Sequence, residues 1–127
     1  MYVHTNRICR IRYCLLYTMH ESMFPKKNHK SMSKLEKDEE AAIKKWCDKR
    51  GLLFIKFTPM GEKGWPDRIA ILPDGTHVWI ELKRNGKKPT KLQHHRMNTL
   101  KQSNVITTWY DSAEECIDFL EAELNAI

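Results

Sequence analysis

An α/β domain with the element order α-β-β-β-α-β-α, in which helices flank a central mixed sheet, is predicted for residues 34–127. Three observations support this fold class. The 127-residue chain is long enough for one compact core and too short for two ordinary domains. Helix-capping signals alternate with short apolar runs after residue 33, and Gly- or Pro-containing stretches separate these runs.

Capping residues and apolar spacing predict the three helices. The first has Ser33 as N-cap, Glu36 three residues later as in a capping box, and Gly51 as its stop. Thr90 caps the second helix, and Asp111 or Ser112 opens an amphipathic third. The predicted helices end near Arg50, Gln102 and Leu124, respectively.

Short apolar, β-branched or aromatic runs predict four strands. These runs are Leu52–Phe57, Arg68–Leu72, His77–Leu82 and Val105–Tyr110. The first run is apolar and alternates poorly, which suits a strand covered on both faces.

Residues 1–33 show no sustained periodicity and are predicted to be a basic, flexible extension of the domain. They lack the apolar segment and cleavage site of a signal peptide, and no run of the chain approaches the ~20 apolar residues that span a bilayer. We therefore expect a soluble, intracellular, cytoplasmic protein. Its four cysteines miss zinc-finger spacing, so reduced thiols are expected.

The net charge of +6 is unevenly distributed. Residues 44–101 carry 14 basic and 5 acidic side chains, whereas residues 111–127 carry six acids and neither Lys nor Arg. Such a basic middle is compatible with a polyanion-binding face and equally with an ordinary solvated surface.

The turn between the two central strands decides which charged side chains can meet. If Pro73-Asp74-Gly75 forms a three-residue loop, Asp67 lies opposite Glu81 on one face of the pleat. A two-residue Asp74-Gly75 turn would shift the register by one residue and place the two carboxylates on opposite faces. Pro73 cannot donate to a ladder and suits the first turn position, which favours the longer loop.

Two carboxylates facing one another across a sheet favour a bound cation between them. Hard oxygen ligands with positions left for water and phosphate match Mg2+ or Mn2+ better than zinc. Lys83 shares the face of Glu81 and could stabilise negative charge or orient an attacking water. The pattern therefore outlines a site for phosphodiester hydrolysis, and the alternative is that Asp67 caps a turn while Glu81 and Lys83 form an exposed ion pair.

The surrounding motif resembles the PD-(D/E)XK nucleases and, more specifically, the VRR-NUC family. Pro66-Asp67 is followed, after thirteen intervening residues, by Glu81-Leu82-Lys83. The flanking residues that carry the closer resemblance are Gly64 to Arg68, Trp79 to Arg84, Gly86 and Gln93. The resemblance covers about Leu35 to Glu121 and implies a restriction-endonuclease-like core.

The resemblance also implies the parts that these residues play. Asp67, Glu81, Lys83 and Gln93 match the family's catalytic positions, and Asp67 and Glu81 would bind metal. Glu40 fits the acid of the first helix best, as a further metal ligand, with Glu36 and Glu39 as alternatives. The expected nucleic-acid contacts are Arg68, Arg84, Lys87, Lys88 and Lys91.

These matches imply a metal-dependent DNA endonuclease acting on branched or Holliday-junction DNA, as a homodimer. The alternatives are a nuclease for flaps, ends or specific duplex DNA, and a noncatalytic DNA-binding module of the same fold. The sequence lacks the G-x4-G-K-[ST] phosphate loop, so no nucleotide cofactor is implied.

Overall fold

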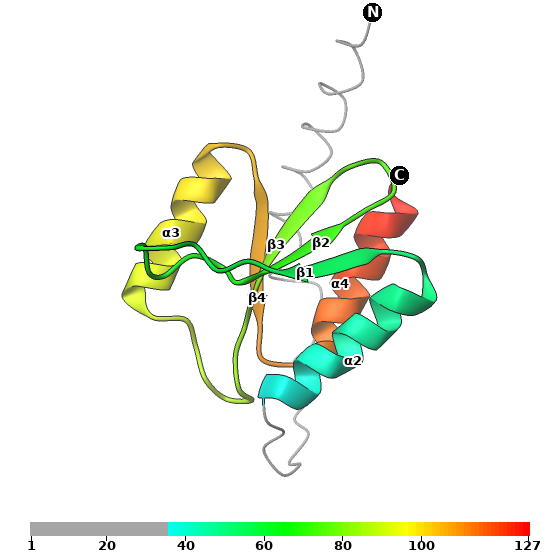
Figure 1. The fold of residues 1–127 in the computed structure, drawn as a ribbon, viewed down its shortest axis with the longest axis horizontal. Helices are drawn as coiled ribbons and strands as arrows, with labels where there is room; N and C mark the ends of the chain where they lie inside the picture. Colours follow the sequence, from blue (N-terminus) through cyan, green and yellow to red (C-terminus); the bar gives the residue numbers. More distant parts are fainter. Residues whose placement is uncertain (1–35) are drawn as a thin grey trace, which may run out of the picture. The chain divides into compact units, whose positions relative to one another are not determined.

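The computed structural model describes residues 36–127, so Ser33 and the extension predicted for residues 1–33 lie outside the described residues. Figure 1 shows a four-stranded sheet with helices on both faces. The elements, in chain order, are α2 (Glu36–Lys49), β1 (Leu53–Lys56), β2 (Arg68–Ile71), β3 (His77–Leu82), α3 (Lys91–Gln102), β4 (Ile106–Tyr110) and α4 (Ala113–Asn125). This confirms the predicted element order.

The sheet is mixed, as predicted, with the strand order β1-β2-β3-β4. Strands β1, β2 and β3 form an antiparallel meander, whereas β4 lies parallel to β3. A parallel neighbour requires a crossover connection, and α3 supplies it between β3 and β4. Helix α3 therefore covers one face of the sheet, while α2 and α4 pack together on the other (Figure 1).

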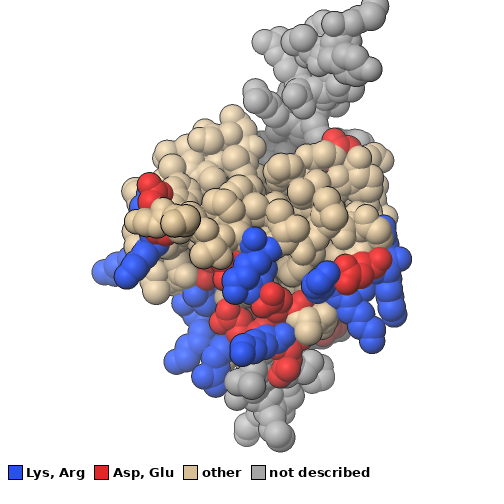
Figure 2. Space-filling model, in the orientation of Figure 1, with Lys and Arg blue, Asp and Glu red and all other residues tan. Residues whose placement is uncertain are grey.

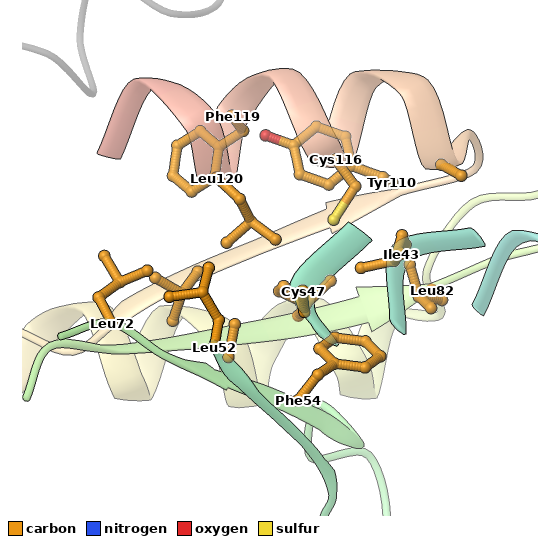
Figure 3. Packing of buried hydrophobic residues seen from close by; sticks show 14 residues of the cluster. Ile43, Cys47, Leu52, Phe54, Leu72, Leu82, Tyr110, Cys116, Phe119 and Leu120 are labelled. Atoms are coloured by element: carbon orange, nitrogen blue, oxygen red, sulfur yellow. The ribbon is translucent and has the colours of Figure 1, made fainter. Parts of the chain in front are cut away.

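The main core lies between the sheet and the pair α2 and α4. Alternate residues of β3, namely Val78, Ile80 and Leu82, point to this face and are at most 3% exposed. Helix side chains including Ile43 and Leu120 close over them (Figure 3). Because these β3 side chains face α2 and α4, Glu81 points to the α3 side of the sheet.

Strand β1 corrects one prediction. It forms an edge of the sheet, and only Phe54 among its four residues is buried. Leu53 and Ile55 remain 60% and 44% exposed on the α3 side, because α3 contacts β4 at the opposite edge. The strand is therefore covered on one face rather than on both.

None of the helices in residues 36–127 is both long and apolar enough to cross a membrane.

Candidate active site

The turn between β2 and β3 has the predicted three-residue form. Leu72 N donates to Thr76 O at 2.9 Å, and Gly75 N donates to Leu72 O at 2.9 Å. Gly75 takes a left-handed φ of 84°, which a glycine adopts without steric cost. Asp74 Oδ1 accepts a hydrogen bond from Thr76 N at 2.9 Å and closes the turn. The prediction for Pro73-Asp74-Gly75 is confirmed.

This turn fixes the register that the site needs. Arg68 pairs with Ile80, so the next positions outward are Asp67 and Glu81. Phe57 N donates to Asp67 O at 2.8 Å, which extends the β1 and β2 pairing to the same position. Asp67 and Glu81 therefore share the α3 face of the sheet, and their like charges act on each other.

Glu81 is almost fully buried, with 4% of its surface exposed. Its Oε1 lies 2.7 Å from Lys83 Nζ and accepts a second hydrogen bond from Gln93 Nε2, also at 2.7 Å. Burial raises the pKa of Glu81, against the effect of Lys83, and the charges of Asp67 and Glu36 raise it further. A cation close to this carboxyl would stabilise its ionised form.

Gln93 joins the start of α3 to this carboxylate. Gln93 N donates to Thr90 Oγ1 at 3.2 Å, and Gln93 Oε1 accepts from Thr90 N at 2.9 Å, which is a complete capping box. The amide oxygen is thus occupied, and the amide nitrogen is directed at Glu81. The sequence predicts the cap at Thr90, and the family resemblance implies a place for Gln93 in the site, but neither indicates that one amide serves both.

Asp67 has one occupied and one unpartnered carboxylate oxygen. Oδ2 lies 2.9 Å from Arg68 Nη1. Oδ1 is buried and has no hydrogen-bond partner among the described residues. A buried acceptor without a partner is costly, so this oxygen is a suitable ligand for a cation.

Arg68, which the sequence predicts as a nucleic-acid contact, is buried in the structure. It is 4% exposed, and its guanidinium binds Glu40 through Nη2 as well as Asp67 through Nη1. The sequence places Arg68 directly after Asp67, but it does not reveal that the guanidinium bridges two acids.

The three acids considered for the first helix have separate surroundings. Glu39 is 6% exposed, and its Oε2 accepts a hydrogen bond from Ala113 N at 2.6 Å, so it caps α4. Glu40 is paired with Arg68, which lowers the pKa of Glu40 through the hydrogen bond between them. Glu36 is the helix acid whose charge acts on Glu81.

The loop that leads into Asp67 is fastened to α3. Arg96 Cζ lies 4.6 Å from the centre of the Trp65 ring, and Arg96 Nε donates to Lys63 O at 3.3 Å. A Cβ atom added at Gly64 would lie 2.6 Å from Leu92 Cγ, so the loop backbone approaches the helix closely. Gly64 and Trp65 belong to the motif that resembles the family, but the sequence did not predict that Leu92 and Arg96 of α3 contact them.

The residues that follow Lys83 form an exposed basic loop. Its exposed basic side chains are Arg84, Lys87, Lys88 and, at the start of α3, Lys91. Gly86 N donates to Asp111 Oδ2 at 2.9 Å and ties the loop to the end of β4. Figure 2 shows charged side chains gathered in the lower half of the face in view, with acidic groups between basic ones.

The donor set suits a hard cation. Asp67 and Glu81 present carboxylate oxygens on one face, and Mg2+ is commonly held by one or two carboxylates while water and phosphate oxygens complete its shell. Residues 36–127 contain no group of three or more His, Cys, Asp or Glu side chains arranged to hold a metal. The structure brings together Glu81, Lys83 and Gln93 by direct contact and places Asp67 on the same face, while Arg68 joins Glu40 to Asp67.

Comparisons with known proteins agree with this fold. The structure is similar to a solved VRR_NUC domain with a TM-score of 0.63 at 24% sequence identity, and the match covers 68% of this chain and 94% of that domain. A phage protein described as "Putative nuclease p44", from Acyrthosiphon pisum secondary endosymbiont phage 1, is 36% identical over 61 residues. That match spans 46% of this chain and 66% of the phage protein. No protein-family model matches the sequence.

Proposed function

Since the chain has the fold of a VRR-NUC domain, as its motif led us to expect, we propose that it is a nuclease that hydrolyses phosphodiester bonds in DNA. The observation that carries the proposal is the placement of Asp67 and Glu81 on one face of the sheet, with Lys83 and Gln93 both bound to Glu81. The nuclease named in the phage relative supports the same reaction class.

The proposed reaction depends on Mg2+ or Mn2+. Asp67, through its unpartnered Oδ1, and Glu81 would hold the ion. When bound, the ion supplies Lewis-acid polarisation of the phosphate and lowers the pKa of an attacking water. Both contacts to Glu81 fall on Oε1, so Oε2 is left outside these two hydrogen bonds and can serve as the ligand.

The remaining residues orient groups and balance charge. Lys83 is 18% exposed at its side chain, so its ammonium can reach a substrate phosphate while it stays close to Glu81. It would stabilise negative charge that develops on the phosphate or position the water. Gln93 holds Glu81 in one orientation, because its amide is fixed at both ends.

The exposed basic loop is the proposed DNA contact. Arg84, Lys87, Lys88 and Lys91 can bind phosphates without regard to sequence, which gives salt-sensitive affinity. Branched or Holliday-junction DNA is the proposed substrate, and a homodimer is the proposed assembly, because a two-fold axis presents two sites to two equivalent strands. Such a protein would act inside a cell, where DNA is found.

A cleavage panel tests the proposal. Junction, flap, nicked and linear DNA are incubated with Mg2+ or Mn2+, and with a chelator as the blank. We expect metal-dependent cleavage of junction DNA, lost in Asp67→Ala and Lys83→Ala although both variants still bind DNA. The matched controls are Asp48→Ala and Lys44→Ala, because these exposed partners form an ion pair with each other on α2.

The same panel separates the alternatives. Metal-dependent cleavage that persists in both Asp67→Ala and Lys83→Ala would refute the site. Preference for flaps or ends would keep the nuclease and replace its substrate. Salt-sensitive DNA binding without cleavage under either metal would identify a noncatalytic DNA-binding module. Sedimentation of the full chain with and without junction DNA tests the homodimer.

A further inference from the structure

We propose that Arg68 is a positioning residue that holds Asp67 with its free oxygen towards the metal site, and that Glu40 acts through Arg68 and not as a metal ligand. This inference rests on the proposed function and deepens it. It assigns a part to two residues whose contacts differ from those expected from the sequence.

Arg68 begins β2 and is paired with Ile80, so its side chain leaves the sheet on the α2 and α4 face. Asp67, the preceding residue, belongs to the opposite face. The guanidinium nevertheless binds Asp67 twice, because Nη1 donates to the backbone oxygen at 3.1 Å and lies 2.9 Å from Oδ2. With 5% of its side chain exposed, Arg68 is held in this position by its surroundings.

These two contacts determine how the Asp67 carboxylate is turned. With Oδ2 on the guanidinium, Oδ1 is the oxygen left for another partner, and it is buried without one in the described part of the chain. A carboxylate fixed through one oxygen is prepared to bind a cation through the other, without losing rotational freedom when the cation arrives.

Glu40 holds the other end of the guanidinium. Its Oε2 binds Nη2, so the two acids occupy both terminal nitrogens of one planar group. A lysine at position 68 offers a single nitrogen and cannot reproduce this geometry. The single positive charge is shared between two carboxylates, which keeps Asp67 from being fully neutralised by its neighbour.

Glu40 Oε2 is bound to Arg68 Nη2, on the same guanidinium that binds Asp67, and this contact places Glu40 with Arg68 rather than with the metal in the proposed arrangement. A positioning residue and a direct ligand make different predictions when Arg68 is removed. If Glu40 acts through Arg68, the effect of Glu40→Gln on metal affinity disappears when Arg68 is removed. If Glu40 binds the metal directly, that effect persists.

The test measures Mn2+ affinity of the full chain by titration, together with DNA cleavage. The variants are Arg68→Lys, Arg68→Gln, Glu40→Gln and the double variant Arg68→Gln with Glu40→Gln. We expect Arg68→Lys to weaken Mn2+ binding about 10-fold or more, since residues that orient a metal ligand typically contribute 10- to 100-fold. Glu40→Gln should weaken binding only when Arg68 is present, so the double variant matches Arg68→Gln alone.

The control is Lys44→Gln, which breaks the exposed ion pair between Lys44 and Asp48 on the same helix and should leave Mn2+ affinity unchanged. If Arg68→Gln does not fold, the effect of Glu40→Gln is compared between the parent chain and Arg68→Lys instead. Unchanged affinity in Arg68→Lys overturns the inference. So does a Glu40→Gln loss that is equally large with and without Arg68, because Glu40 would then bind the metal directly.

The two readouts separate this inference from the proposed function. A chain that binds Mn2+ through Asp67 and follows the expected cycle, yet cuts none of the DNA substrates, refutes the nuclease and supports the positioning role. If the chain cuts DNA but the losses of Mn2+ affinity in the Glu40 and Arg68 variants add up in the double variant, only the positioning role is refuted. A chain that binds no Mn2+ overturns the positioning role as well.

Discussion

Substitution of Glu39 should destabilise the domain without impairing its chemistry. The Glu39 carboxylate is buried in α2, and its Oε2 accepts a hydrogen bond from Ala113 N, 74 residues away in the sequence, at 2.6 Å. Ala113 begins α4, and the N-cap residue Ser112 makes no side-chain hydrogen bond there. Glu39 thus performs the capping that Ser112 leaves undone, and its negative charge lies at the positive end of the α4 dipole.

The expected size of the effect follows from these contacts. A hydrogen bond to a charged group contributes roughly 1.5–3 kcal/mol, and a lost N-cap costs about 0.5–2 kcal/mol. Glu39→Ala should therefore lower the free energy of unfolding by about 2 kcal/mol, which for a domain of this size lowers Tm by roughly 10 °C. Glu39→Gln keeps an acceptor oxygen of similar shape and should cost about half as much.

Urea denaturation and cleavage assays on the same preparations test both parts of the expectation. Glu114→Gln is the control, because Glu114 is an exposed acid in the first turn of α4. If Glu39→Ala is no less stable than Glu114→Gln, the capping argument is wrong. If fully folded Glu39→Gln loses metal-dependent cleavage, Glu39 is the acid of the site and its assignment as a cap fails.

Three further outcomes are expected. Gly64→Ala should destabilise the domain by about 1–2 kcal/mol. The loss should exceed that of Gly61→Ala, because both glycines have positive φ but only a Cβ at position 64 would meet Leu92. Equal denaturation midpoints for the two variants would contradict this. The hydrogen bond from its arginine partner lowers the pKa of Glu40, so Glu40→Gln should be less stable than the parent at pH 7. That difference in unfolding free energy should be full above the ordinary Glu pKa of about 4.3 and should shrink as the pH falls from there through the lowered pKa of folded Glu40, and a constant difference in urea titrations would count against it. Burial raises the pKa of Cys47 to about 11, so alkylation followed by mass spectrometry should find Cys47 protected until unfolding.

The hairpin shows how far local sequence can determine a site. Pro73 cannot donate to a ladder, and Gly75 permits the left-handed turn position, so the loop length follows from two residues. The loop length gives the register, and the register places Asp67 with Glu81. The cap at Thr90 was likewise predicted from local sequence, whereas the expected place of Gln93 in the site came from the family resemblance and its capping contact was not predicted.

Other features depend on contacts that local sequence does not encode. An apolar strand such as Leu53–Lys56 is compatible with a central or an edge position, and only the order of strands in the sheet decides between them. The cap that Glu39 provides for α4 joins residues 74 apart. An arginine next to an aspartate can face solvent or the interior, and the structure places Arg68 in the interior, where it binds Glu40.

The amide of Gln93 makes one helix end and the candidate site mutually dependent. Its oxygen closes the first turn of α3, and its nitrogen restrains Glu81. Fraying of that turn would remove one of the two contacts on Glu81 Oε1 and leave the carboxylate to Lys83, and displacement of Glu81 would remove a restraint on the turn. Local opening at Thr90 would therefore loosen the hold on Glu81, so the dynamics of a surface helix terminus are coupled to the orientation of a buried carboxylate.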